Sequence, residues 1–305
     1  MPSECRKGCR PARGDVWIGT LVLGTILVVS SFAATSRLEH ARALYQRGEF
    51  RAALEVLQDV AQIDAGVFFL RGQCHYMMGD AKAASVLLEK AVALDPDNSR
   101  FHLWLGRAYG RRAETSNFLF APRLAIRARQ SFETALQLDA GNLEAINDLF
   151  EYCLDAPGLL GGGVEKATAL ANRVRYLDPA EYQYDQARLA EKRQQYQVAE
   201  RHYRRAAELA PNDPGRLADL GEFLASRGRH QESDDVFARA HAIAPGSASV
   251  VFQTAKTYVQ SHRNIETART MLKRYLSLQL TPDDPPRYEA ARLLEQVSAA
   301  QRALR

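Results

Sequence analysis

Three arginines in the first half of the chain are spaced to lie along one face of a helix. Arg100, Arg107 and Arg111 follow one another at seven and four residues, which corresponds to about one or two helical turns. A guanidinium binds carboxylates and phosphates through forked hydrogen bonds. The spacing therefore predicts a row of cations suited to an acidic or carboxylate-bearing peptide.

The next but one predicted helix offers an alternative partner for this row. It carries acidic and amide side chains at the same helical spacing: Glu144, Asn147, Glu151 and Asp155. The arginines would then form an interhelical salt-bridge ladder instead of binding a second molecule. Both interpretations fit the residues, because the same charges serve either purpose.

No known catalytic or metal-binding motif is present in the sequence. It lacks the H-E-x-x-H, G-x-S-x-G and Walker lysine motifs, and its seven histidines form no metal-spaced pairs. The glycine-rich segment 157–163 could present backbone N–H groups to an anion, but a turn that needs positive φ is the favoured explanation. We therefore predict no catalytic residue, no metal site and no cofactor.

A repeated phrase shows which elements must position these residues. The stretch 90–96 returns in altered form at 134–140, 205–211 and 239–245, and Pro211 and Pro245 are 34 residues apart. A fixed period of this length is typical of helix-turn-helix arrays. Each unit is too small to bury its own apolar stripe, so the units must stack into an all-α solenoid.

The repeat resembles the tetratricopeptide repeat. The copy at about 214–247 carries that pattern at Leu217, Leu220, Gly221, Leu224, Gly228, Phe237, Ala240 and Pro245. The resemblance implies about seven units between 35 and 281, wound as a right-handed superhelix, with a capping helix in 282–305. It also implies a concave groove lined by the first helix of each unit, and a scaffold that holds a protein or peptide partner there.

Helical spacing along these first helices selects the candidate groove residues. They are Phe69, Gln73, Tyr76, Arg100, Arg107, Arg111, Asn147, Glu151, Tyr184, Arg188, Phe252 and Lys256. Some members of the family grip a terminal carboxylate with a Lys and Asn clamp. Phe69, Gln73 and Leu103 stand at the matching positions here, so a chaperone tail is not the expected partner.

Two units carry insertions between their helices, near 114–123 and at 157–163. Both insertions contain apolar residues: Phe118, Leu119, Phe120, Leu159 and Leu160. Because the units are adjacent, we expect the insertions to emerge on one edge of the solenoid. They would form a lip that binds a partner, or they would pack on each other as a satellite apolar cluster.

The N-terminus predicts a membrane segment. Residues 1–15 form a basic tail, and residues 16–34 contain no charged side chain over a length that spans about 28 Å as a helix. The basic flank predicts a cytoplasmic N-terminus and an extracytoplasmic solenoid, periplasmic in a bacterium. A signal peptide cleaved after Ala33 is the alternative.

Composition narrows the function further. The net charge of +4 over 305 residues gives no sign of nucleic-acid binding. We therefore predict a membrane-tethered scaffold for a protein or peptide partner, without enzymatic activity. Two alternatives stay open: a small-molecule or anion site at the glycine-rich edge, using Arg111, Arg123 and Lys166, and a self-associating structural subunit. Oligomeric state is not predicted.

Overall fold

The computed structural model describes residues 36–58, 60 and 64–303. Its regular structure in these residues is helical, which confirms the all-α fold class, and a helix over residues 36–46 comes first. The helices that follow are α2 (Phe50–Gln58), α3 (Ala65–Met77), α4 (Ala81–Leu94), α5 (Ser99–Thr115), α6 (Ala121–Leu138), α7 (Leu143–Asp155), the 3-10 helix η1 (Gly158–Leu160), α8 (Val164–Val174), α9 (Pro179–Lys192), α10 (Tyr196–Leu209), α11 (Pro214–Ser226), α12 (His230–Ile243), α13 (Ala248–Gln260), α14 (Ile265–Ser277) and α15 (Arg287–Ala303).

Short polar caps and glycines set the ends of these helices. The Asp80 carboxylate accepts the backbone N–H of Ala83 at 2.9 Å, and the Asp178 carboxylate accepts two N–H groups of the first turn of α9. Such side chains satisfy N–H groups that have no partner within the helix. Gly79 (φ +88°) and Gly228 (φ +75°) form the left-handed turns that separate the two helices of their units. The local sequence thus fixes a helix-turn-helix at each repeat.

Glycines on the first helix of a unit let the second helix come close. A Cβ atom added at Gly106 of α5 would lie 2.5 Å from the Phe132 ring on α6, and one at Gly221 of α11 would lie 2.9 Å from the Phe237 ring on α12. Both aromatic rings are buried. The ring occupies the space that a side chain would take, so the helix pair packs as one unit.

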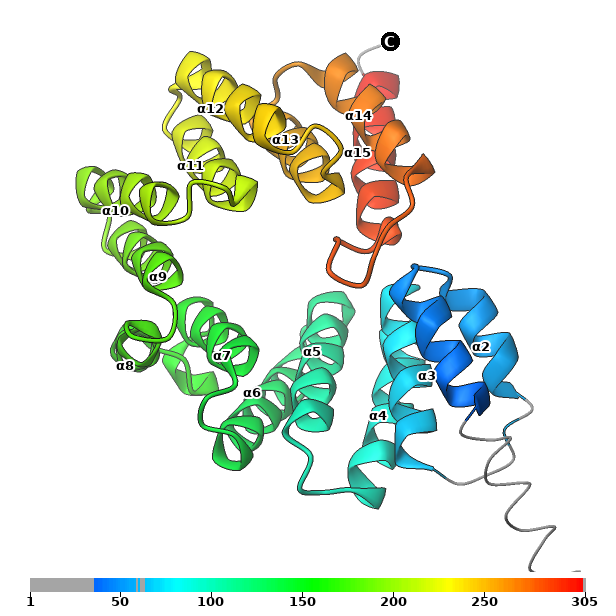
Figure 1. The fold of residues 1–305 in the computed structure, drawn as a ribbon. Helices are drawn as coiled ribbons and strands as arrows, with labels where there is room; N and C mark the ends of the chain where they lie inside the picture. The colour runs from blue at the N-terminus through cyan, green and yellow to red at the C-terminus, as the bar shows by residue number, and fades with distance from the viewer. Residues whose placement is uncertain (1–35, 59, 61–63, 304–305) are drawn as a thin grey trace, which may run out of the picture.

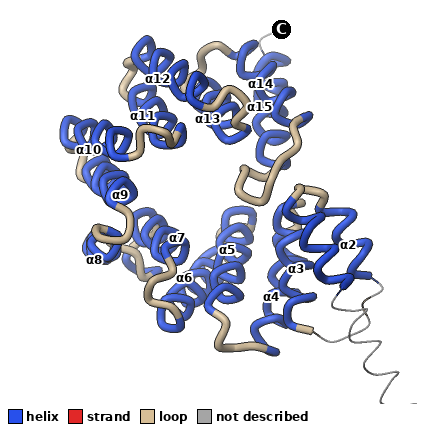
Figure 2. The backbone as a smooth tube through the Cα atoms, in the orientation of Figure 1, coloured by secondary structure: helices blue, strands red, loops and turns tan. Residues whose placement is uncertain are grey.

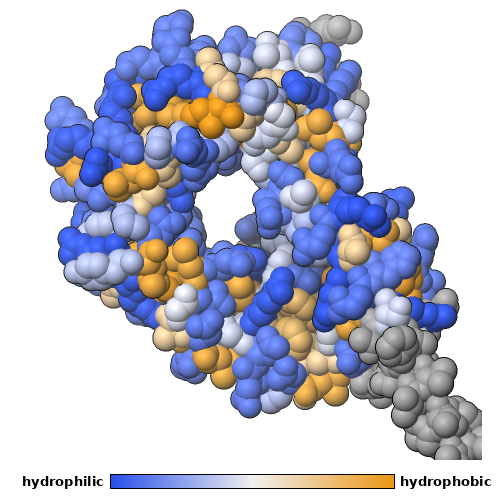
Figure 3. Space-filling view, viewed as in Figure 1, coloured by the Kyte–Doolittle hydropathy of each residue, from blue (hydrophilic) through white to orange (hydrophobic). Residues whose placement is uncertain are grey.

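The stacked units curve into a ring. Figure 1 shows α5, α7, α9, α11 and α13 on the inner side, with α6, α8, α10 and α12 outside them. Figure 2 shows the same order of helices and turns along the tube. A hole passes through the middle of the space-filling view in Figure 3. The first helices of the units therefore form the concave face.

The C-terminal segment returns to the first units and closes the ring. The Gln279 side chain donates a hydrogen bond to the carbonyl of Arg47 at 3.4 Å. Gly48 (φ +71°) lies against the backbone of Leu280, where a Cβ atom would be 1.8 Å from the carbonyl oxygen. Beyond this contact, α15 packs on α13 and α14. The segment between α14 and α15 thus bridges the two ends of the array.

The predicted basic tail 1–15 and apolar segment 16–34 lie outside the described residues. Among the helices that are described, none combines the length and the apolar character needed to cross a bilayer.

Candidate functional site

The concave face carries charged side chains that pair from unit to unit. On α5, the Arg107 guanidinium lies 2.6 Å from Asp148 and 2.9 Å from Glu144, both on α7. Burial raises the pKa of Asp148 in spite of the opposing attraction of Arg107. This contact confirms the interhelical salt bridge between the third and fourth units that the sequence offered as an alternative.

The next pair of first helices repeats the arrangement. Arg188 of α9 lies 3.0 Å from Glu151 of α7, and it also donates a hydrogen bond to the Tyr184 hydroxyl at 3.1 Å. That hydroxyl in turn donates to Glu151 at 3.4 Å. One turn further along, Lys192 lies 3.7 Å from Asp155. The residues that the sequence placed in a groove therefore hold neighbouring units together here.

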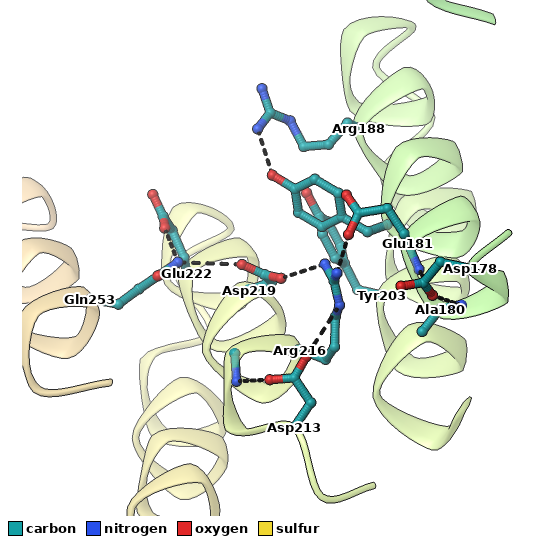
Figure 4. Close-up of polar contacts among 12 residues, drawn as sticks. Asp178, Ala180, Glu181, Arg188, Tyr203, Asp213, Arg216, Asp219, Glu222 and Gln253 are labelled. Atoms are coloured by element: carbon teal, nitrogen blue, oxygen red, sulfur yellow. Dashed lines mark hydrogen bonds and ion pairs between the residues drawn. The ribbon is translucent and has the colours of Figure 1, made fainter. Parts of the chain in front are cut away.

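Figure 4 shows how the ladder continues from α9 through α11 to α13. Arg216 of α11 pairs with Glu181 of α9 and lies 3.3 Å from Asp219. Asp219 also accepts a hydrogen bond from Gln253 of α13 at 3.4 Å, and Gln253 donates to Glu222 at 2.9 Å. Asp219 is therefore held between a cation and an amide from two different helices.

Two carboxyl groups of this region have strongly raised pKa values. Burial, with a smaller contribution from Glu222, raises the pKa of Asp219 to about 7 in spite of the neighbouring Arg216. Burial and the neighbouring Glu181 raise the pKa of Asp185 to about 8. Asp185 is 1% exposed, and neither of its carboxyl oxygens has a hydrogen-bond partner in the part of the chain described. A neutral carboxyl is the form that such burial favours.

A cleft opens over this part of the concave face. Its volume is about 620 Å³, and its walls come from α7, α9, α10, α11 and α13. It is lined by Leu154, Asp155, Tyr184, Arg188, Glu191, Lys192, Tyr203, Asp219, Glu222, Phe223, Ser226, Gln253 and Lys256. Both charge signs, two amphipathic tyrosines and an amide thus line one cleft, which can exchange hydrogen bonds along an extended chain.

The structure divides the predicted groove residues between two regions. Tyr184, Arg188 and Lys256 line the cleft just described. Gln73, Tyr76, Arg100 and Arg107 line a separate hollow of about 360 Å³, across from the C-terminal residues 282–284 and Pro286. In the N-terminal half of the concave face, the chain's own C-terminal segment therefore forms the opposite wall of a hollow, and Arg100 stays exposed there.

Three of the predicted groove residues are buried, which corrects their expected placement on the open face. Phe69 stacks on Phe101 of the next unit with ring centres 4.6 Å apart, Gln73 is 2% exposed, and Phe252 packs against Tyr275. Aromatic rings on neighbouring helices gain more from contact with each other than from exposure. Partner contact by the predicted groove residues as a set stays a prediction.

Arg111 contacts the last helix of the array, and Asn147 lies partly buried within it. The Arg111 guanidinium pairs with Glu114 at 2.6 Å and lies 4.7 Å from the centre of the Tyr288 ring of α15. Asn147 of α7 has a buried side-chain oxygen without a hydrogen-bond partner in the described structure. Arg111 therefore belongs to the contact that closes the ring.

Sequence reasoning missed several members of the ladder: Asp148, Glu181, Arg216, Asp219 and Gln253. Their signal was present, since Arg216, Asp219 and Glu222 follow one another at three-residue steps on a first helix. The pairing from one unit to the next depends on how the units are rotated, which spacing within one helix does not give.

The two insertions both lie along α6. The side chains of Phe118, Leu119 and Phe120, just before this helix, are 83%, 69% and 63% exposed, and Leu159 of η1 is 91% exposed. Helix η1 contacts α6, and Arg129 of that helix lies over Gly161. Such exposure does not fit the satellite cluster that was the alternative to a lip. Only Leu160 is partly buried.

In the glycine-rich turn, the N–H groups of three glycines donate hydrogen bonds to backbone carbonyls of the chain itself. The N–H of Gly161 donates to Gly158, that of Gly162 to Pro157, and that of Gly163 to Cys153. Gly161 and Gly163 have φ of +89° and +139°. These bonds leave no donor of the three glycines for an anion, so the geometry favours a structural turn over an anion site.

The described residues contain no group of three or more His, Cys, Asp or Glu side chains placed to hold a metal ion. Cys74 and Cys153 are free, buried thiols, and burial raises the pKa of Cys74 to about 12. A thiol with such a pKa stays protonated and behaves as a small apolar side chain.

Comparison with known proteins agrees with this architecture. Residues 65–98 match the model of the tetratricopeptide repeat. A tetratricopeptide repeat protein from Parabacteroides merdae superposes with a TM-score of 0.58 at 13% identity, over 87% of this chain and 99% of that one. The thermophilic protein TTC0263 from Thermus thermophilus gives 0.50 at 19% identity, over 66% and 98%.

These likenesses show the fold, and the matched repeat spans α3 and α4. Tetratricopeptide repeats generally mediate protein–protein interactions. No protein with curated annotation matches the sequence.

Proposed function

We propose that this tetratricopeptide-repeat ring is a scaffold that holds an extended segment of a protein partner in the cleft between α7 and α13. The observation that supports it most is the division of the concave face. In the N-terminal half, residues of the 282–286 segment line a hollow of about 360 Å³ together with the groove residues, whereas the cleft between α7 and α13 has a larger volume of about 620 Å³ and is lined by inner and outer helices of the array alone.

The lining of the cleft indicates what kind of segment fits. The Tyr184 and Tyr203 rings meet edge to face with centres 6.0 Å apart, and the Phe223 ring lies 5.1 Å from that of Tyr203. Around this aromatic floor, Glu222 and Lys256 pair at 3.1 Å and are each about one-third exposed. Partly exposed ion pairs contribute little to stability, so a ligand can exchange them at small cost. A polar segment with an apolar or aromatic anchor suits such a site.

Tethering forms a second part of the proposal. Residues 16–34 anchor the scaffold in a membrane, with the solenoid on the extracytoplasmic side, because the apolar run is preceded by a basic tail. Cleavage after Ala33 would instead release the ring. An assembly of identical copies is the remaining candidate, and a mass that grows with concentration would favour it.

Selection of peptides tests the cleft directly. A random-peptide phage library is panned against the full-length chain in detergent, and the affinity of the selected peptides is measured by isothermal titration. We expect the double variant Arg188→Ala/Lys256→Ala to weaken binding roughly tenfold, since it removes two charge-assisted contacts.

The matched control is Arg205→Ala, which removes an exposed cation from the outer helix α10. It should leave the affinity unchanged. Peptides that bind the double variant as tightly as the natural chain, or a library that yields no binder at all, would contradict the proposal.

A further inference from the structure

A second hollow lies on the edge of the ring, away from the cleft. It has a volume of about 590 Å³ and lies between the α3–α4 turn and the insertion that precedes α6. It is lined by Gly79, Asp80, Ala81, Lys82, Arg112, Thr115, Ser116, Phe120, Arg123, Leu124 and Arg127. Four cationic side chains thus meet one carboxylate.

Two of the cations are held in place by neighbours. Arg112 donates a hydrogen bond to the Ser85 hydroxyl at 2.8 Å. The Arg127 guanidinium lies 4.8 Å from the centre of the Tyr109 ring and 3.6 Å from Glu89. A guanidinium has five N–H donors, so each of these arginines keeps donors for a further acceptor.

The other two cations stand at the exposed rim. The side chains of Lys82 and Arg123 are exposed and have no hydrogen bond or ion pair to any described residue. The single carboxylate, Asp80, is turned to its own helix, where it accepts the N–H of Ala83. With Glu89 beside Arg127, two carboxylates stand against four cations, so the hollow carries an excess of positive charge.

Beside the hollow, three consecutive apolar side chains project into solvent. Phe118, Leu119 and Phe120 are 83%, 69% and 63% exposed. The Asn117 side chain accepts the N–H groups of Leu119 and Phe120 at 3.1 and 3.3 Å, which holds the loop in a tight turn. Exposed aromatic groups of this kind mark an interaction site when they gather in one place.

We propose that this edge docks on an anionic phospholipid surface, with Phe118, Leu119 and Phe120 in the headgroup region and the basic hollow around a lipid phosphate. An anionic membrane attracts juxtaposed cations, and apolar side chains bind its interface by burying their surface. The apolar tip projects instead of forming a groove, which suits insertion into a bilayer better than reception of a peptide. This inference concerns an edge separate from the proposed peptide cleft and does not depend on it.

A fluorescent probe at the loop tip tests this docking in the full-length chain. Because residues 16–34 are predicted to bind membranes by themselves, the probe must report the loop alone. Cys5 and Cys9 are replaced by Ser, Leu119 is changed to Cys and labelled with an environment-sensitive nitrobenzoxadiazole, and the buried Cys74 and Cys153 stay unlabelled.

With vesicles that contain phosphatidylglycerol, we expect the probe emission to shift to shorter wavelength and to be quenched by nitroxide lipids. Vesicles of phosphatidylcholine alone should give little change. In the same background, Lys82→Glu/Arg123→Glu should raise the vesicle concentration needed for half-maximal response roughly tenfold or more.

Two matched controls test whether the response is specific to this edge of the ring. A probe at Ile243→Cys on α12, across the ring, should not respond (Figure 1). Arg201→Glu/Arg239→Glu makes the same change in net charge at exposed sites of α10 and α12 and should leave the response intact. No response at position 119, an equal response to both vesicle types, or an equal response at 243 would overturn the proposal. So would a protein crosslink from position 118 without any response to vesicles.

Discussion

The guanidinium of Arg111 on α5 lies 4.7 Å from the centre of the Tyr288 ring on α15. Tyr288 also covers Gly79, where an added Cβ atom would come within 2.9 Å of the ring. These two contacts join the second and third units to the last helix, and they close the ring together with the contacts of Gln279 and Leu280 with the first unit.

Replacing Tyr288 with Ala should open the ring. We expect the free energy of unfolding to fall by about 1–3 kcal/mol, because both packing partners are lost. The radius of gyration measured by small-angle X-ray scattering should rise. Tyr288→Phe is the control, since the hydroxyl oxygen is buried without a hydrogen-bond partner among the described residues and its removal keeps the ring contact. An unchanged radius in Tyr288→Ala would mean that other contacts close the ring.

The Arg107–Asp148 pair should couple the third and fourth units. Arg107→Ala is expected to destabilise the fold by about 1–3 kcal/mol, because it leaves a half-buried carboxylate without its cation. A double-mutant cycle with Asp148→Ala, followed by urea unfolding, should give a coupling of about 0.5–2 kcal/mol. The exposed pair Arg205–Glu208 is the reference and should show less than about 0.5 kcal/mol. Equal coupling in both pairs would argue against a structural ladder.

Two glycines of α5 should respond in opposite ways to alanine. At Gly106 a Cβ atom would meet the Phe132 ring at 2.5 Å, whereas at Gly110 nothing lies within 4 Å. Gly106→Ala should therefore cost about 1–3 kcal/mol through overpacking. Gly110→Ala should add up to about 1 kcal/mol, because alanine favours the helix. Thermal unfolding separates the two, and a stabilised Gly106→Ala would show that α5 and α6 are less tightly packed than the structure has them.

Asp185 should make the ring less stable as the pH rises. Its pKa is about 8 in the fold and about 3.9 in an unfolded chain. The folded state therefore binds more protons between these values, and the stability from this group is complete below pH 4 and is lost on the way to pH 8.

Asp185→Asn removes that dependence. The variant should gain about 1–3 kcal/mol over the natural chain at pH 8.5 and less at pH 5.5, as measured by urea unfolding. Asp97→Asn, at an exposed position, serves as the control. A gain that does not grow with pH would show that Asp185 is ionised in the folded ring.

The sequence predicted the fold well because local signals repeat. Asp80 and Asp178 mark helix starts, Gly79 and Gly228 mark turns, and Gly106 and Gly221 mark close helix contacts. Each of these acts within one unit of about 34 residues, so one sequence is enough to read it.

The candidate site was harder to predict, because it depends on how the units are arranged in space. The hollow that Arg100 and Arg107 share with the 282–286 segment joins parts of the chain that are far apart in sequence. This approach depends on the curvature of the whole solenoid, which is the sum of the small rotations between successive units. No single sequence motif encodes that sum. Phe69 and Phe252 were misplaced for a related reason, since the same spacing places a residue in the groove or against a neighbouring helix: Phe69 packs on the next unit, and Phe252 packs on the second helix of its own unit.

The central claim is that the cleft between α7 and α13, and not the smaller hollow in the N-terminal half of the ring, holds the partner. A photo-crosslinking amino acid at Lys256 and, separately, at Arg100 tests this in cells, with adducts identified by mass spectrometry. We predict that position 256 captures a recurrent protein partner and that position 100 gives an internal crosslink to residues 282–286. Partner capture from position 100, with none from position 256, would contradict the account and move the site to the N-terminal half of the ring.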